Sequence, residues 1–130
     1  MENNSVNVTK LAMRQVEQYC KQYVYDVNVA NGWFEGERSI GGEVALIHSE
    51  VSEMLEAYRA WGMEDPTDDA KFDGREGFIV KPEGIGSEVA DVFIRLMDFC
   101  YRHNIDLTKE FFRKMAYNAT RGYKHGGKNL

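Results

Sequence analysis

The chain has 130 residues and a mass of 14.9 kDa, a length that predicts one domain over residues 1–130. Its 43% hydrophobic and 28% charged residues are typical of a globular protein and exclude collagen-like, low-complexity and wholly disordered chains. The net charge of −5 makes the chain a poor candidate for sequence-independent binding to a nucleic-acid polymer, which requires a concentrated basic footprint, so we expect no such partner.

Apolar residues at helical spacing predict a first amphipathic helix over residues 8–24, with Ser5 or Asn7 as its N-cap. The following residues, 26–42, are rich in Asn and Gly. They predict a connection that holds at most one short helical turn, around Trp33.

A second periodic run predicts a helix over residues 43–61, ended by Gly62. Residues 63–86 contain both prolines and several glycines, and they predict a long loop with one short extended piece at 78–80. A loop of this length in a compact domain is usually functional.

A third helix is predicted over residues 87–103, and its almost unbroken apolar surface makes it the element expected to be most buried. Asp106 is the expected N-cap of a fourth helix that runs to Arg121. The side chains expected to face inward from that helix are Leu107, Phe111, Phe112, Met115, Ala116 and Ala119. The tail, residues 122–128, is glycine-rich and basic, and no strand is needed, so the fold class is all-α.

Cys20 and Cys100 both lie within apolar helical patterns, so we expect buried, reduced thiols rather than a disulfide or a thiolate metal site. The N-terminus is polar, and no apolar run reaches the length of a membrane span or a signal-peptide core. We therefore expect a cytoplasmic protein without a membrane partner.

Two of the predicted helices carry carboxylates at the same spacing. Glu50 and Glu53 lie on the second helix, and Glu88 and Asp91 lie on the third. Residues three apart project from one face of a helix, so each pair presents two like charges together. All-oxygen clusters of this kind favour Mg²⁺, with Mn²⁺ as the alternative. Because Mg²⁺ usually shares its coordination with substrate phosphates, the implied substrate is a phosphate compound.

The alternative interpretation is structural. The second helix would have a solvated acidic face, and the charged residues of the third helix would form ion pairs along that helix. The residues concerned are Glu50, Glu53 and Glu56 on the second helix and Asp91, Arg95, Asp98 and Arg102 on the third. Such pairs contribute only about 0.2–0.5 kcal/mol each. Repetition of the motif on two amphipathic helices favours the metal site.

A basic stripe on the fourth helix complements the acidic motifs. Lys114, Asn118 and Arg121 share one face and lead into the glycine-rich tail, which suits phosphate oxygens. The alternative is a positive helix C-terminus that complements the helix dipole. Trp33 and Trp61 are expected in the core or at an interface.

Three blocks of this sequence, residues 45–59 (ALIHSEVSEMLEAYR), 88–95 (EVADVFIR) and 114–128 (KMAYNATRGYKHGGK), resemble MazG-like nucleotide pyrophosphohydrolases. The likeness is closest to the short single-domain members found in bacteria and phages, and it covers about residues 43–62 and 83–128. It implies an all-α fold of four to five helices that assembles as a homodimer or homotetramer.

The resemblance also implies an activity and a set of site residues. Members of the family hydrolyse nucleoside triphosphates between the α and β phosphates, and their E-x-x-E and E-x-x-D motifs, which hold Mg²⁺, match Glu50, Glu53, Glu88 and Asp91. The family's C-terminal substrate-binding region matches Lys114, Asn118, Arg121, Tyr123, Lys124 and His125. One departure is the long interval between the two motifs, residues 54–87, which we attribute to the 63–86 loop and expect to reshape the nucleotide pocket.

On this hypothesis Glu53 is the general base, and Arg95 and Lys114 balance charge on the phosphates. Trp61 is a further candidate substrate contact. One alternative is a noncatalytic nucleotide-binding or helical interaction protein that keeps the fold. Another is a purely structural bundle, which Mg²⁺ would not stabilise.

Overall fold

The computed structural model describes residues 4–33, 35–67 and 80–123. Within these ranges the chain forms four α-helices and no strand, which confirms the predicted all-α class. The helices are α1 (Asn4–Ala30), α2 (Ile40–Trp61), α3 (Ile85–Arg102) and α4 (Leu107–Thr120). None of these helices combines the length and apolarity required to cross a membrane.

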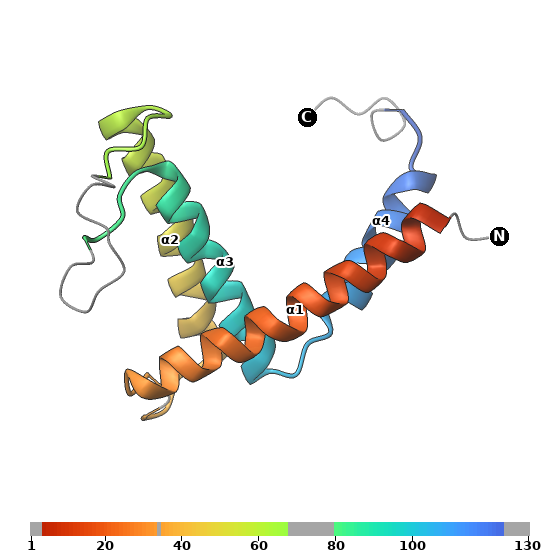
Figure 1. The fold of residues 1–130 in the computed structure, drawn as a ribbon, viewed down its shortest axis with the longest axis horizontal. Helices are drawn as coiled ribbons and strands as arrows, with labels where there is room; N and C mark the ends of the chain where they lie inside the picture. The colour runs from red at the N-terminus through yellow and green to blue at the C-terminus, as the bar shows by residue number, and fades with distance from the viewer. Residues whose placement is uncertain (1–3, 34, 68–79, 124–130) are drawn as a thin grey trace.

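The helices are arranged as an open V (Figure 1). One arm is the pair α2 and α3, and the other is α4 packed on the N-terminal half of α1. The C-terminal half of α1 continues across the base of the first arm and contacts α3 there. Because α3 packs on both α1 and α2, it connects the two arms.

Helix α1 is longer than predicted at both ends. The proposed caps Ser5 and Asn7 lie inside the helix, so that prediction is wrong. The helix also continues through residues 26–30, where the sequence predicted a connection. A tertiary contact stabilises this extension, because Asn28 donates a side-chain hydrogen bond to Asp98 Oδ1 at 3.1 Å.

Helix α2 starts three residues earlier than predicted and ends at the expected residue. It begins at Ile40 because Ser39 caps it, with Oγ accepting from the Gly42 N–H at 3.0 Å. Its end is marked by Gly62, which has φ 61° and donates its N–H to the Tyr58 carbonyl at 2.8 Å. A positive φ of this kind favours glycine over every other residue type.

The segment between α2 and α3 is irregular over residues 63–67 and 80–84, in agreement with the predicted loop. Residues 85 and 86, the last two of the predicted loop, belong instead to α3. The predicted extended piece at 78–80 falls outside the described residues except for Val80, which is in neither a helix nor a strand.

Helix α3 buries Met97 and Cys100, yet Val89 and Phe93 remain 48% and 44% exposed. The prediction that this helix is the most buried element is confirmed among the described helices, although part of its apolar surface stays exposed in the single chain. Both cysteines are free thiols, as predicted, but Cys20 is only half-buried.

Helix α4 begins at the predicted cap, since Asp106 Oδ1 accepts from the Lys109 N–H at 3.0 Å. The prediction of its inward face is largely wrong. The exposed members are Phe111, Met115, Ala116 and Ala119, whereas Leu107 and Phe112 are half-buried. The reason is that, among the described helices, α4 packs mainly on α1, in a separate arm of the V.

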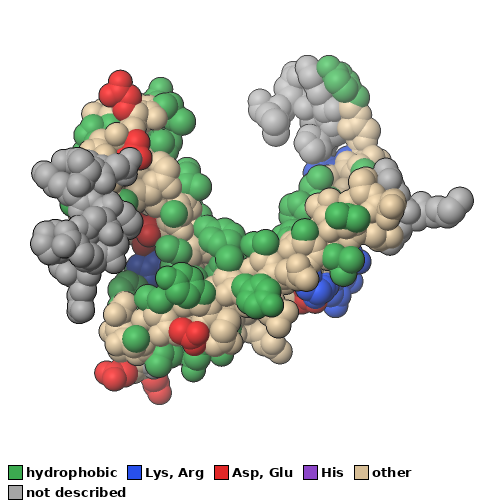
Figure 2. All heavy atoms as spheres, viewed as in Figure 1, with side chains coloured by type: hydrophobic (Ala, Val, Ile, Leu, Met, Phe, Trp, Pro, Cys, Tyr) green, Lys and Arg blue, Asp and Glu red, His purple; other side chains and the backbone are tan. Residues whose placement is uncertain are grey.

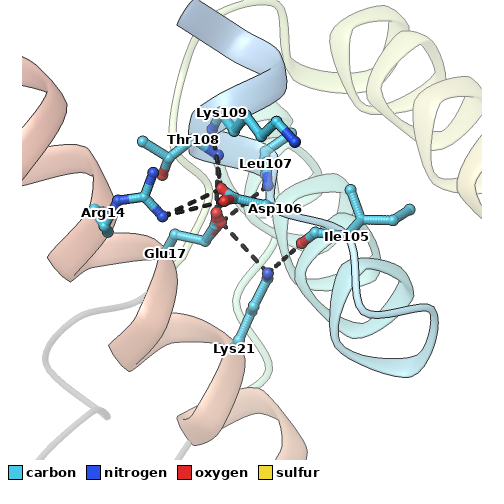
Figure 3. Close-up of polar contacts among 8 residues, drawn as sticks. All are labelled: Arg14, Glu17, Lys21, Ile105, Asp106, Leu107, Thr108 and Lys109. Atoms are coloured by element: carbon cyan, nitrogen blue, oxygen red, sulfur yellow. Dashed lines mark hydrogen bonds and ion pairs between the residues drawn. The ribbon is translucent and has the colours of Figure 1, made fainter.

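A buried polar junction attaches α4 to α1 (Figure 3). Glu17 is 7% exposed, and its carboxylate accepts from the backbone N–H groups of Thr108 at 2.8 Å and Leu107 at 3.1 Å. Lys21 lies 3.4 Å from the same carboxylate and also donates to the Ile105 carbonyl. A carboxylate at this position satisfies N–H groups that a helix N-terminus leaves without intrahelical partners.

Candidate metal centre

Carboxylates from α2 and α3 converge between the two helices. Glu50, Glu53 and Glu88 each place one oxygen within 4.8 Å of the others. Glu50 is buried, Glu88 is half-buried and Glu53 is exposed. The i, i+3 spacing turns both glutamates of α2 toward α3, and helix pairing brings Glu88 to meet them.

Asp91 belongs to the same electrostatic cluster. Burial raises its pKa above the ordinary range, and the Glu50 charge raises it further. The pKa of Glu88 is also raised, first by burial and then by the charges of Asp91, Glu53 and Glu50. We refer to Glu50, Glu53, Glu88 and Asp91 as the acidic cluster. The raised pKa values of Glu88 and Asp91 are those expected of carboxylates that are partly buried beside like charges.

One buried oxygen of the acidic cluster has no hydrogen-bond partner among the described residues. Glu88 Oε2 is buried, and no described residue donates to it. An unsatisfied buried carboxylate oxygen carries a free-energy cost. An all-oxygen donor set with one such atom fits a hard divalent cation such as Mg²⁺.

Arg95 is a predicted site residue that forms a hydrogen-bonded ion pair with a member of the acidic cluster. Its Nε donates to Glu50 Oε1 at 2.9 Å, and its guanidinium carbon lies 5.2 Å from the centre of the Trp33 ring. Arg95, Trp33, Glu50 and Asp91 line one hollow beside the cluster. The predicted contact between Arg95 and substrate phosphates stays a prediction, but the structure does place this side chain next to the carboxylates.

A second hollow lies on another side of the cluster and contains Trp61. It is lined by Glu53, Glu88, Trp61 and Lys81, among others. The structure thus places Trp61 next to the acidic cluster, where a substrate contact was expected. Lys81 is a site residue that the sequence did not predict, because a residue in an irregular loop has no periodicity from which its direction can be inferred.

The predicted basic residues do not join this site within one chain. Lys114, Asn118 and Arg121 lie on or directly after α4, in the other arm of the V (Figure 1). The Arg121 guanidinium carbon lies 5.8 Å from the centre of the Tyr117 ring, and Tyr123 is 85% exposed. Two further candidates, Lys124 and His125, lie outside the described residues.

The structural interpretation of the charges on α3 is correct in part. Arg102 donates to Asp98 at 2.8 Å, an i, i+4 pair along the helix. Arg102 also lies 3.7 Å from the buried Glu43, to which His103 Nε2 is paired. Arg95, in contrast, pairs across the helices with Glu50. The charges of α3 therefore connect it to α2 and do not only stabilise α3 itself.

Comparison with known proteins adds nothing to these observations. No protein-family model, no curated protein and no solved structure matches the chain. An assignment of function therefore depends on the acidic cluster and on the resemblance of the sequence motifs.

Proposed function

We propose that the protein is a Mg²⁺-dependent nucleoside triphosphate pyrophosphohydrolase of the MazG-like type. The observation that supports this most directly is the convergence of Glu50, Glu53 and Glu88 within 4.8 Å, with Asp91 beside them. These are the residues on which the motif resemblance places the ion. Mn²⁺ is the alternative ion, and the substrate is a nucleoside or deoxynucleoside triphosphate in the cytoplasm.

The four carboxylates of the acidic cluster would hold the ion, which supplies charge screening and polarisation of phosphate oxygens. Glu50 is buried and already paired with Arg95, so it is suited to a fixed ligand role. Glu53 is the exposed member of the cluster and can reach a water molecule in the second hollow. In our proposal Glu53 accepts the proton of the water that attacks the α-phosphorus, the bond between the α-phosphorus and the bridging oxygen breaks, and pyrophosphate leaves.

The same proposal includes a homo-oligomer. Hydrophobic side chains are visible along α1 and on the arms of the V (Figure 2), and Leu11, Tyr19 and Tyr23 of α1 are 67%, 72% and 71% exposed. Apolar exposure on this scale is typical of a surface that a partner covers. A second copy of the chain is the occupant we propose, as a dimer or as part of a tetramer.

Pyrophosphate release from a panel of nucleoside triphosphates in the presence of Mg²⁺ tests this function. We expect turnover by the wild-type protein and a loss of about 10²–10⁴-fold in Glu53→Gln and Asp91→Asn. Glu110→Gln, an exposed change on α4, is the matched control and should keep full activity. Full turnover in Glu53→Gln would remove the proposed site, and tight nucleotide binding without product would favour the noncatalytic alternative.

A further inference from the structure

The two ends of the long connection between α2 and α3 are joined at a neck, formed by residues 63–67 and 80–84. Thr67 Oγ1 accepts from the Glu83 N–H at 3.0 Å and donates to the Glu83 carbonyl at 3.2 Å. Asp65 Oδ1 accepts from the Thr67 N–H at 2.9 Å, a contact that lowers the pKa of Asp65. The two hydrogen bonds between Thr67 and Glu83 fix residues 63–67 against residues 80–84.

Gly84 closes the neck by direct packing. It is buried, with φ 96°, and a Cβ atom at this position would lie 2.7 Å from Pro66 Cδ and 3.3 Å from the Glu64 carbonyl oxygen. No larger residue fits there without displacing the chain, and the positive φ independently favours glycine. The neck is therefore tightly packed immediately before α3 begins.

The neck presents one cation to the acidic cluster. Lys81 lines the second hollow together with Glu53 and Glu88, and its charge partly offsets the rise in the pKa of Glu88 and Asp91. No ion pair joins Lys81 to a carboxylate of the described residues. Lys81 thus borders the same hollow as Glu53 and Glu88 without forming an ion pair with either of them.

We propose that Lys81 is a phosphate-binding residue, positioned by the neck to contact the phosphate oxygens of an anion held at the acidic cluster. The inference rests on the proposed function and names a specific contact for the substrate. A lysine ammonium provides three N–H donors and a compact charge, which suit phosphate oxygens. The negative charge of the cluster repels anions. A phosphate group therefore binds there only between a divalent metal ion on one side and a positively charged side chain such as Lys81 on the other.

Two binding measurements on Lys81→Met test the proposal, because they should change in opposite directions. Mn²⁺ alone should bind about 2–5-fold more tightly, since a nearby positive charge has been removed. Inorganic pyrophosphate in the presence of saturating Mn²⁺ should bind about 10-fold more weakly, since a charged donor has been lost. Lys81→Arg should stay close to wild type in both measurements.

Lys109→Met is the control, because Lys109 is an exposed lysine on α4 in the other arm. Equal pyrophosphate affinity in the Lys81 and Lys109 variants would overturn the proposal. So would a parallel loss of Mn²⁺ and pyrophosphate binding in Lys81→Met, which would indicate a structural role only.

These outcomes are separable from those of the proposed function. If the wild-type protein binds Mn²⁺ and pyrophosphate but hydrolyses no nucleoside triphosphate, the enzyme assignment is wrong and the role of Lys81 in anion binding stands. If hydrolysis occurs and Lys81→Met has wild-type pyrophosphate affinity, the enzyme assignment stands and the role of Lys81 is wrong.

Discussion

Arg95 and Glu50 form an ion pair that connects α3 to α2, with Nε and Oε1 2.9 Å apart. Glu50 is buried, and its carboxylate would otherwise face three other acidic side chains without a compensating charge. The pair therefore makes it possible to pack the acidic cluster between two helices. It also compensates the charge of one of the four carboxylates within the protein itself.

Replacement of Arg95 by Met should destabilise the protein by about 1–3 kcal/mol, because Glu50 loses its partner while it stays buried. Urea denaturation followed by circular dichroism measures this change. The double variant Arg95→Met with Glu50→Gln should recover part of the loss, since the unpaired charge is then removed as well. An unchanged unfolding midpoint in the single variant would show that the pair contributes nothing.

Glu88 should make the metal-free protein less stable as the pH rises. Its folded-state pKa is raised, so the folded protein holds this proton more tightly than the unfolded chain does. The associated stability is complete below the ordinary carboxyl pKa, about 4.3, and is lost as the pH rises through the raised value. In EDTA, Glu88→Gln should therefore unfold at a higher temperature than wild type at neutral pH, and the difference should diminish toward pH ~4.

In the presence of Mg²⁺, wild type should unfold at a higher temperature than Glu88→Gln, the reverse of the order expected in EDTA. A cation that binds the folded state at 100 times its dissociation constant stabilises by about 2.7 kcal/mol, and wild type should gain more of this than Glu88→Gln. Glu110→Gln serves as the control for a carboxylate outside the cluster. Equal Mg²⁺-induced shifts in melting temperature for wild type and Glu88→Gln would contradict metal binding at this residue.

Glu17→Ala should loosen α4 without disturbing the arm formed by α2 and α3. The variant removes the acceptor of the Leu107 and Thr108 N–H groups and leaves Lys21 without its carboxylate, at a cost of about 1–3 kcal/mol. Hydrogen exchange followed by mass spectrometry should show faster exchange in α4 and little change in α2. Gln18→Ala, an exposed neighbour on α1, should leave both rates as they are.

Sedimentation velocity should detect a species whose mass is a multiple of 14.9 kDa. Tyr23→Asp should shift the population toward monomer, because it places a charge in the exposed apolar surface of α1. Gln18→Asp adds the same charge at an already polar position and should leave the distribution unchanged. A wild-type protein that sediments only as a monomer at micromolar concentration would contradict the proposed assembly.

The sequence by itself determined the features that depend on local interactions. The helical class follows from apolar periodicity, the end of α2 from Gly62 and the start of α4 from Asp106, because each involves residues within a few positions of one another. The i, i+3 spacing likewise predicts that Glu50 and Glu53 share a face. Local signals failed at α1, whose extension to Ala30 coincides with the contact between Asn28 and Asp98.

Only the tertiary structure decided which of these faces meet. It turned the carboxylates of α2 toward Glu88 of α3, paired Glu50 with Arg95, and brought Lys81 from an irregular loop to the same place. It also placed Lys114 and the exposed apolar face of α4 in the other arm, away from that cluster. The physical reason is that periodicity specifies the direction of a side chain about its own helix, whereas the positions of the helices relative to one another depend on contacts between residues far apart in the chain.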